Sequence, residues 1–541
     1  MAFFRDGLDF EGLSTHAIWL DYDLDGDLDL YLLNHAIHSR QSYVASWRRI
    51  VDAPKVGDKL YRQDDGFFVS VAMEAGIYSS ALGYGLGIAS SDLNIDGWPD
   101  LYVGNDFHED DYLYLNSSQG TFTESLWQTV GATSRSTMGI DIADLNNDGL
   151  PDIVALDMLA PDLFTQRTVG NTNADALMKI LHDFGYGTQL SRNTLQLHRG
   201  ITPEGIPFFS EIGAFAGIEA TDWSWAPLLA DFDGDGWKDL YVTNGIPRRP
   251  NDLDYIEYVA TPNIQQILQQ GTADQIAEIV QRMPTAIVPN YAFKGGDDLM
   301  FEDMSTNWGL DESVIGNGVA YGDLDLDGDP DLVINTLNHP SLIYRNESTN
   351  NYISIVLRGK DQNTSAIGAK VHVWVSGIQQ LQEQFLSRGF QSSVEPVLHF
   401  GIGSAPNADS IIVTWPSELQ SNVGRVSAGA RLTLHEIDGK ALLPRKTISQ
   451  ATFQSVTDHG ITFVHVQDEV TDHEILPVLP YWRSTLGAAL AVADVNGDGL
   501  EDVYLGGARD QPGALYFQSV DGSFRSMPFP DIHRAMEEAY F

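Results

Sequence analysis

One pattern of oxygen-bearing residues occurs six times in the sequence and has the chemistry of a cation site. Each copy fits D-x-[DN]-x-D-G-x-x-D, which puts a carboxylate or amide oxygen at positions 1, 3, 5 and 9. Glycine at position 6 permits a positive φ, so the loop can curl and direct positions 1, 3 and 5 at one centre. Calcium takes about six to eight oxygen ligands in such loops. The pattern predicts Ca²⁺ as cofactor, with about one ion per loop and up to six in the chain.

We number the copies loops 1 to 6 in chain order. The predicted metal ligands are the side chains at positions 1, 3, 5 and 9 of each loop. They are Asp21, Asp23, Asp25 and Asp29; Asp92, Asn94, Asp96 and Asp100; Asp144, Asn146, Asp148 and Asp152; Asp231, Asp233, Asp235 and Asp239; Asp323, Asp325, Asp327 and Asp331; and Asp494, Asn496, Asp498 and Asp502.

Two other interpretations of the loops compete with this one. An EF-hand requires a bidentate Glu at position 12, whereas position 12 is apolar in all six copies: Leu32, Val103, Ala155, Val242, Ile334 and Leu505. Clusters of Asp and Gly also form solvated turns that need no metal. A turn requires no carboxylate at position 9, however, and uncompensated carboxylates in one loop repel one another. We therefore favour calcium loops of a β-structure.

The segments around each loop have the composition of β-strands. Apolar runs such as 30–33 follow a loop directly, and runs such as 318–321 precede one. Further runs, such as 60–68, pair as hairpins closed by Gly or Asp turns. One loop with one hairpin makes about four strands, which is one blade of a β-propeller. Two longer intervals between loops predict helical inserts, at Thr165–Phe184 and Asp252–Met283.

The composition argues against several classes of function. The 541 residues include 75 acidic and 31 basic side chains, which gives a formal charge of −44. Because polyanion binding needs a basic surface, nucleic acid and anionic membrane surfaces are poor partners. No apolar run reaches the length of a membrane span. The absence of cysteine removes disulfides, thiol nucleophiles and Cys-ligated zinc.

Segments outside the loops resemble one family. They are 104–112, 136–141, 221–225 and 244–254 in the first part of the chain, and 366–370, 388–393, 398–403 and 413–417 further on. With the loops, these segments are similar to the FG-GAP/VCBS-repeat proteins that carry an ASPIC and UnbV domain, the cartilage acidic protein-like family. The resemblance implies an all-β fold, in which calcium-loop propeller blades form a partial ring of about seven blades when complete.

The expected domain boundaries follow from this resemblance. Residues 1–345 form a propeller incomplete at its N-terminus, 346–437 an ASPIC/UnbV-like β-domain, 438–451 a linker, and 452–541 the truncated start of a second propeller. We expect the chain to be a fragment whose signal sequence is lost with the missing N-terminus. An incomplete ring exposes strand edges, so self-association is expected.

The resemblance and the loops together indicate a non-enzymatic calcium-binding protein. We expect it at the cell surface or outside the cell, in adhesion or ligand binding, with an unknown protein or glycan as partner. The alternative is a propeller-based enzyme of polysaccharide metabolism, since paired carboxylates can cleave glycosidic bonds. The sequence contains no H-E-x-x-H, G-x-S-x-G or Walker A motif.

Weaker candidates have ordinary structural interpretations. Trp223 and Trp225 could stack on a sugar or pack in a blade core. His459, His465 and His473 could bind a metal but lack tight ligand spacing.

Overall fold

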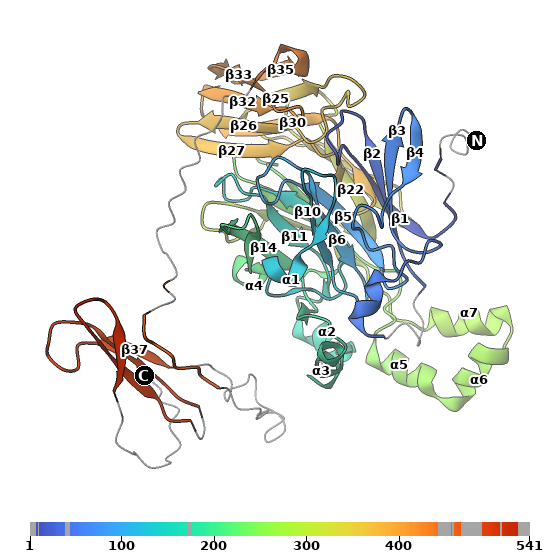
Figure 1. Ribbon diagram of the computed structural model, residues 1–541. Coiled ribbons are helices and arrows are strands. Elements are labelled where there is room, and N and C mark those ends of the chain that lie inside the picture. The colour runs from blue at the N-terminus through green and yellow to red at the C-terminus, as the bar shows by residue number, and fades with distance from the viewer. Residues whose placement is uncertain are drawn as a thin grey trace. The chain divides into compact units, whose positions relative to one another are not determined.

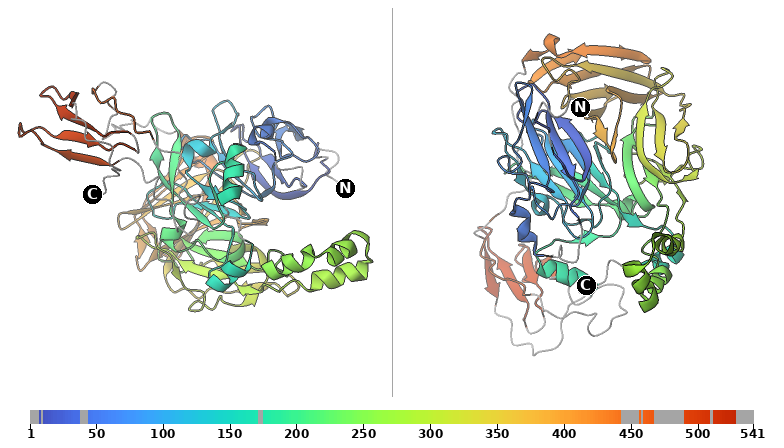
Figure 2. Two further views of the ribbon diagram at one scale, coloured as in Figure 1. Left: turned by 90° about the horizontal axis from the view of Figure 1, so that it is seen from below. Right: turned by 90° about the vertical axis from the view of Figure 1, so that its right-hand side faces the viewer.

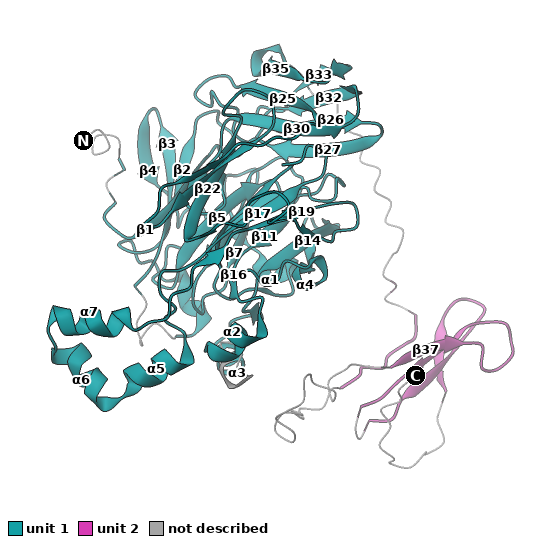
Figure 3. Ribbon diagram, turned by 180° about the vertical axis from the view of Figure 1, so that it is seen from behind, with its two compact units in different colours: residues 1–443 teal, residues 444–541 magenta. Residues whose placement is uncertain are grey.

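The computed structural model describes residues 7–8, 10–37, 44–170, 175–441, 456, 459–466, 489–508 and 511–527. The chain divides into two compact units, residues 1–443 and 444–541 (Figure 3). Residues 442–451 of the expected linker lie outside the described residues.

Within the described part of the first unit, five sheets share one plan: a strand, an acidic loop, a second strand and a third strand (Figure 1). In the first four sheets a further strand pairs with the third as a hairpin. The strands, sheet by sheet, are β1 (Ser14–Leu20), β2 (Asp29–Asn34), β3 (Lys59–Asp64) and β4 (Phe67–Ser70); β5 (Gly85–Ser91), β6 (Asp100–Asn105), β7 (Tyr112–Leu115) and β8 (Thr123–Glu124); β10 (Ile140–Ala143), β11 (Asp152–Ala155), β14 (Thr194–Ile201) and β15 (Pro207–Glu211); β12 (Met158–Leu159), β16 (Asp222–Ala230), β17 (Asp239–Asn244), β19 (Tyr291–Lys294) and β20 (Glu302–Asp303); and β22 (Gly316–Gly322), β23 (Asp331–Thr336) and β24 (Leu342–Tyr344).

The sheets pack face to face as propeller blades. The first strands of successive sheets contact one another in the order β1, β5, β10, β16 and β22. Alternate side chains along each strand point to opposite faces, so apolar residues of neighbouring sheets meet in shared cores. Ile18 and Leu33 of the first sheet, for example, lie in one cluster with Ile88 and Leu101 of the second. The predicted all-β fold of propeller blades in a partial ring is confirmed.

A β-sandwich follows the fifth sheet, at the upper edge of Figure 1. Its core contains Phe400 and Trp415, both almost fully buried. One sheet consists of β30 (Val397–Gly403), β25 (Asn351–Arg358) and β35 (Ala430–His435); the other of β27 (Ile378–Glu383), β26 (Lys370–Val375), β32 (Ser410–Thr414), β33 (Leu419–Val423) and β36 (Lys440–Ala441).

A hairpin of the sandwich enters the propeller. It consists of β28 (Ser387–Arg388) and β29 (Ser392–Ser393). β28 contacts β1 and β5, whereas β29 contacts β22. The hairpin therefore lies between the first strand of the fifth sheet and that of the first sheet. At its tip, Gly389 pairs with Ile140 of β10 as an isolated bridge.

Both predicted inserts are helical. The first contains α2 (Leu163–Thr168) and α3 (Asp175–Asp183), and the second α5 (Leu253–Ala260), α6 (Pro262–Gln270) and α7 (Ala273–Gln281). Figures 1 and 2 place these helices on the side of the propeller away from the sandwich. Shorter helices and strands connect the blades: η2 (Ser46–Ile50), α1 (Leu126–Thr129), β9 (Thr133–Ser134), β13 (Gln189–Leu190), α4 (Gly213–Ala216), β18 (Val288–Pro289) and β21 (Ser313–Val314).

The second unit contains one described sheet. Its strands are β37 (Leu490–Ala493), β38 (Asp502–Leu505), β39 (Ala514–Gln518) and β40 (Phe524–Met527), and loop 6 joins β37 to β38. This is the blade plan of the first unit. Across the described parts of both units, no helix has the length and apolar character that a membrane span requires.

Candidate metal-binding loops

The backbone of each loop curls through two left-handed residues. The glycine at position 6 has a positive φ in all six loops, as the sequence predicts. Position 4 is also left-handed, and in four loops it is not glycine: Leu24, Ile95, Asn147 and Leu326. A bulky residue at positive φ is strained, so the surrounding hydrogen bonds must hold the curl.

The position-9 carboxylate supplies much of that support. In loop 2, Asp100 Oδ2 accepts the backbone N–H of Leu93 at 2.9 Å, and its Oδ1 accepts the N–H of Asn116 at 2.7 Å. The other five loops repeat both bonds through Asp29, Asp152, Asp239, Asp331 and Asp502. Position 9 therefore fastens the loop to the third strand of its own sheet, a role that the sequence pattern did not reveal.

Three carboxylates of one loop converge in loops 1, 4 and 5. The position-5 carboxylate accepts the N–H of position 7, as in the bond from Trp237 to Asp235 Oδ1 at 3.0 Å. Ligand oxygens lie within 4.8 Å of one another in three groups among the described residues: Asp21, Asp23 and Asp29; Asp231, Asp233 and Asp239; and Asp323, Asp325 and Asp327. Loop 5 thus brings together positions 1, 3 and 5, whereas loops 1 and 4 bring together positions 1, 3 and 9.

Several of these oxygens are buried without a hydrogen-bond partner. They are Oδ1 of Asp21, Asp23 and Asp323. Burial, followed by repulsion from Asp25, raises the pKa of Asp21 to about 7. Burial also raises the pKa of Asp144 to about 7. A divalent cation fits this donor set, because it would coordinate the unpaired oxygens and offset the repulsion.

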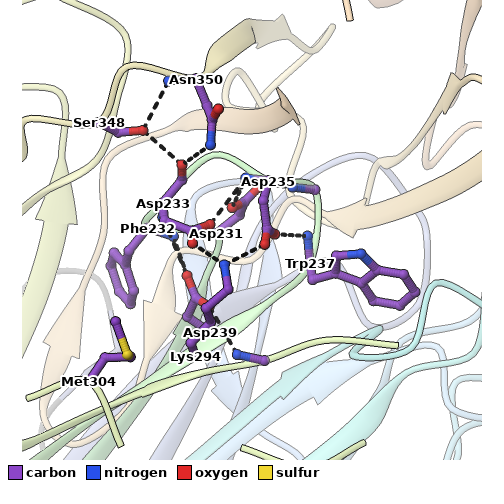
Figure 4. A network of polar contacts seen from close by, with 12 residues as sticks. Asp231, Phe232, Asp233, Asp235, Trp237, Asp239, Lys294, Met304, Ser348 and Asn350 are labelled. Carbon is purple, nitrogen blue, oxygen red and sulfur yellow. Dashed lines mark hydrogen bonds and ion pairs between the residues drawn. The ribbon is translucent and has the colours of Figure 1, made fainter. Parts of the chain in front are cut away.

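Two lysines reach into the loops. Lys294, at the end of β19, directs its Nζ at Asp233 and at Asp235 Oδ2, the latter at 2.5 Å (Figure 4). Lys370 of the sandwich forms an ion pair with Asp92 and lies 3.8 Å from Glu383. Loops 2 and 4 thus combine acidic ligands with a side-chain cation.

The sandwich lies over the loop face of the propeller. Around loop 1, Asn363 N–H donates to Gly26 O at 3.2 Å. Around loop 4, Gly403 N–H donates to Gly234 O at 2.9 Å, and Figure 4 shows Ser348 and Asn350 on the carbonyl oxygen of Asp233. These contacts make the acidic loops part of the interface between propeller and sandwich.

Loops 2, 3 and 5 complete this interface. Ser91 donates to Glu383 at 2.5 Å beside loop 2, and the N–H of Asp323 in loop 5 donates to Glu395 at 2.6 Å. In loop 3, Asn147 Nδ2 donates to Gly236 O of loop 4 at 3.0 Å, and Gly149 lies against the side chain of Gln379 of the sandwich. The nine-residue pattern specifies no basic residue, so it predicted neither Lys294 nor Lys370 at the loops.

A small cavity separates the sandwich from the centre of the propeller. It has a volume of about 40 Å³ and includes Asp141, Lys238, Glu383 and Arg388 in its lining. Arg388 Nη2 donates to Asp141 Oδ2 at 2.8 Å and to Leu229 O at 3.1 Å. Arg388 therefore anchors the inserted hairpin.

Among the weaker candidates, Trp225, His459 and His465 have structural contacts, whereas the indole nitrogen of Trp223 is buried without a hydrogen-bond partner. Trp225 packs on Phe390 with ring centroids 5.1 Å apart, and its indole N–H donates to Gly245 O at 2.8 Å. His459 Nδ1 accepts the N–H of Ile461, and His465 Nδ1 lies 3.1 Å from Gly506 O. His473 lies outside the described residues.

Comparisons with known proteins match a segment in each part of the first unit. The FG-GAP-like repeat model matches residues 92–155, and the ASPIC and UnbV model matches residues 359–441. Cartilage acidic protein 1 of Mus musculus is 25% identical over 357 residues, which cover 64% of this chain and 44% of that protein. Integrin alpha-3 of Mus musculus is 36% identical over 81 residues, which cover 13% of this chain and 8% of that protein.

The chain spans less than half the length of the cartilage acidic proteins it matches, 44% of the mouse protein and 42% of the human one. Among solved structures, the exotype rhamnogalacturonan lyase YesX aligns with a TM-score of 0.27 at 12% identity, over 78% of this chain and 62% of that one. The predicted resemblance is confirmed: this chain joins FG-GAP-like repeats to an ASPIC and UnbV domain and is homologous to cartilage acidic protein 1.

Proposed function

We propose that this chain is a non-enzymatic calcium-binding propeller protein whose metal loops fasten the ASPIC/UnbV domain to the propeller. The observation that carries the proposal is the set of buried, unpaired carboxylate oxygens of Asp21, Asp23 and Asp323. A buried charged oxygen without a partner is costly. Calcium coordinated by these oxygens would remove that cost, and the all-oxygen donor set suits it.

Calcium at the loops would stabilise the interface as well as each blade. Loop 4 illustrates the connection, because the backbone oxygens of Asp233 and Gly234 accept hydrogen bonds from Asn350 and Gly403 of the sandwich side. An ion that fixes the curl of the loop also fixes these acceptors. Metal binding and domain docking are therefore coupled in this proposal.

The similarity to integrin alpha-3 supports a role in adhesion or ligand binding at the cell surface or outside the cell. Extracellular calcium modules work with dissociation constants of about 0.1–1 mM. Since the sandwich lies over loops 1 to 5, we assign the protein or glycan ligand to a different face of the propeller. A non-enzymatic role accords with the pairing of Asp141 with Arg388 in the interface cavity.

The test is thermal unfolding of the full chain in about 2 mM calcium and in excess chelator, with the bound metal measured. A site with a Kd about tenfold below the free calcium adds about 1.4 kcal/mol, so several sites raise the Tm of the first unit strongly. Asp21→Ala should lose about one ion, whereas Asp274→Ala on α7 should lose none. An equal Tm in both buffers with no bound calcium would contradict the proposal.

The enzyme alternative has its own test. The calcium-loaded chain is incubated with a panel of polysaccharides, and both retention and cleavage products are measured. Binding without products supports the proposal; sustained product formation overturns the non-enzymatic assignment while leaving the calcium loops untouched.

A further inference from the structure

The six loops fall into two classes by the residue at position 3. Loops 1, 4 and 5 have Asp there, and loops 2, 3 and 6 have Asn. Both side chains offer one oxygen to a cation, but only Asp adds a negative charge. Six copies of one structure within a single chain make it possible to ask what else changes with that residue.

One position on the third strand changes together with position 3. In every loop, the position-9 carboxylate accepts a backbone N–H from the third strand, and we call the residue just before that donor the flanking residue. In loop 4 the donor is Gly295, so the flanking residue is Lys294. By the same bonds, the flanking residues of loops 1 to 6 are Arg62, Leu115, Leu197, Lys294, Arg345 and Phe517.

We call a loop with Asp at position 3 an Asp loop and one with Asn there an Asn loop. The flanking residue is basic in each Asp loop and apolar in each Asn loop. The strand register confirms that these positions are equivalent. In each sheet, the residue before the flanking residue pairs with the one directly after position 9, as Phe293 pairs with Leu240 and Tyr114 with Leu101. Counted over positions 1, 3, 5 and 9 and the flanking residue alone, an Asp loop has four carboxylates and one cation, and an Asn loop has three carboxylates and an apolar flank, so both have a formal charge of −3. Positions 7 and 8 add further charges in four loops: Asp27, Asp329, Lys238 and Glu501.

The side-chain contacts show which donor pairs with the position-5 carboxylate in each class of loop. In Asn loops the position-3 amide donates to Oδ2 of the position-5 Asp, at 2.9 Å in loop 2, 3.0 Å in loop 3 and 2.9 Å in loop 6. In loop 4, Lys294 Nζ donates instead to Oδ2 of Asp235, the position-5 residue. In loops 1 and 5 the flanking arginine instead forms its ion pair outside the loop, Arg62 with Asp64 at 2.9 Å and Arg345 with Glu347. Each also interacts electrostatically with its loop, Arg62 with Asp23 and Arg345 with Asp325 and Asp327.

We propose that the flanking residue determines the calcium affinity of its loop, and that a basic flanking residue competes with the ion for the position-3 carboxylate. This inference rests on the proposed calcium binding. The unpaired, buried oxygens of Asp21 and Asp323 are the independent sign that these loops accept a cation. The flanking residue keeps the added charge of an Asp loop balanced when the ion is absent.

Loop 4 allows a direct test, because Trp237 at its position 7 can sensitise the luminescence of bound Tb³⁺. Trp98 at position 7 of loop 2 is first replaced by Phe, so that the strongest remaining signal comes from loop 4. Calcium is then titrated against bound Tb³⁺ in the full chain. Lys294→Leu should tighten calcium binding at loop 4 about tenfold or more, and Asp233→Asn should weaken it, since ligand charge tunes affinity.

The double variant distinguishes pairing from independent effects. Asp233→Asn with Lys294→Leu recreates the residues of loop 2, Asn94 and Leu115. Its calcium affinity should lie within about threefold of that of Asp233→Asn alone, because Lys294 then has no position-3 carboxylate to pair with. If Lys294→Leu folds poorly, Lys294→Gln replaces it: this variant removes the charge, keeps a polar side chain and should also tighten calcium binding. Lys55→Leu, at an exposed lysine outside the loops, should leave the affinity unchanged.

Two results would overturn the inference in different ways. If calcium displaces Tb³⁺ but the two single effects simply add in the double variant, the pairing is wrong and the calcium loops stand. If calcium fails to displace Tb³⁺ from the parent protein at millimolar concentration, the proposed function fails and this inference fails with it.

Discussion

Loops 3 and 6 share six of their nine residues and the same local bonds, yet the pKa values of their first carboxylates shift in opposite directions. Asp144 Oδ2 accepts the N–H of Gly149 at 3.0 Å, and Asp494 Oδ2 accepts that of Gly499 at 2.8 Å. Burial raises the pKa of Asp144 to about 7. The N–H donors of its own loop, led by Gly499, lower the pKa of Asp494.

The difference comes from what surrounds each loop. Leu145, which follows Asp144, is 3% exposed, whereas the matching Val495 is 56% exposed. Loop 3 lies against loop 4, which contacts the sandwich. The nine residues thus determine the shape of a loop, and the packing around it determines what its charges cost. A buried loop depends more on a compensating cation than an exposed one.

The largest expected effect concerns the hairpin that anchors the sandwich over loops 1 to 5. Arg388→Met leaves Asp141 buried without its partner, which typically costs about 3–5 kcal/mol. Denaturant unfolding should show this loss in the first unit and leave the transition of the second unit unchanged. Arg425→Met, at an exposed ion pair with Asp409, should cost less than about 1 kcal/mol. Equal losses in both variants would mean that the hairpin does not anchor the sandwich.

A smaller, calcium-dependent effect is expected at loop 2. Lys370→Met removes the cation that pairs with Asp92 and should lower the Tm of the first unit in chelator. In about 2 mM calcium the loss should shrink, because a bound divalent ion replaces the missing charge. Thermal unfolding in both buffers measures the difference. A loss of the same size in both would show that Lys370 acts only through packing.

The smallest effect compares the two loops directly. In chelator at neutral pH, Asp144→Asn should raise the stability of the first unit, because a buried charge without an ion is removed. Asp494→Asn should leave the second unit equally or slightly less stable, since its carboxylate accepts several N–H bonds. Calorimetry that resolves two transitions measures both. Changes of the same sign would remove the contrast between the loops.

The repeat pattern predicted more of the site than of its surroundings. Position 6 has the predicted positive φ, and the strands begin and end at the loops as the apolar runs suggested. The helical inserts and the family resemblance are confirmed as well. All of these follow from residues close together in the sequence, where turn chemistry and side-chain alternation act.

The contacts between distant residues were not predictable in the same way. Lys370 reaches Asp92 across 278 positions, and Arg388 donates to Asp141 across 247. No local pattern in the chain connects such residues. The flanking residues were visible in the sequence, but only the strand register showed which of them are equivalent.

By itself, the sequence determined the acidic loops, the strands beside them and the class of metal that suits them, because these depend on side-chain oxygens and glycines within nine residues. Only the tertiary structure decided which loops are buried, which cation reaches each one and where the sandwich docks. The physical reason is that the electrostatic cost of a carboxylate depends on the low-dielectric surroundings and on charges brought near it by folding.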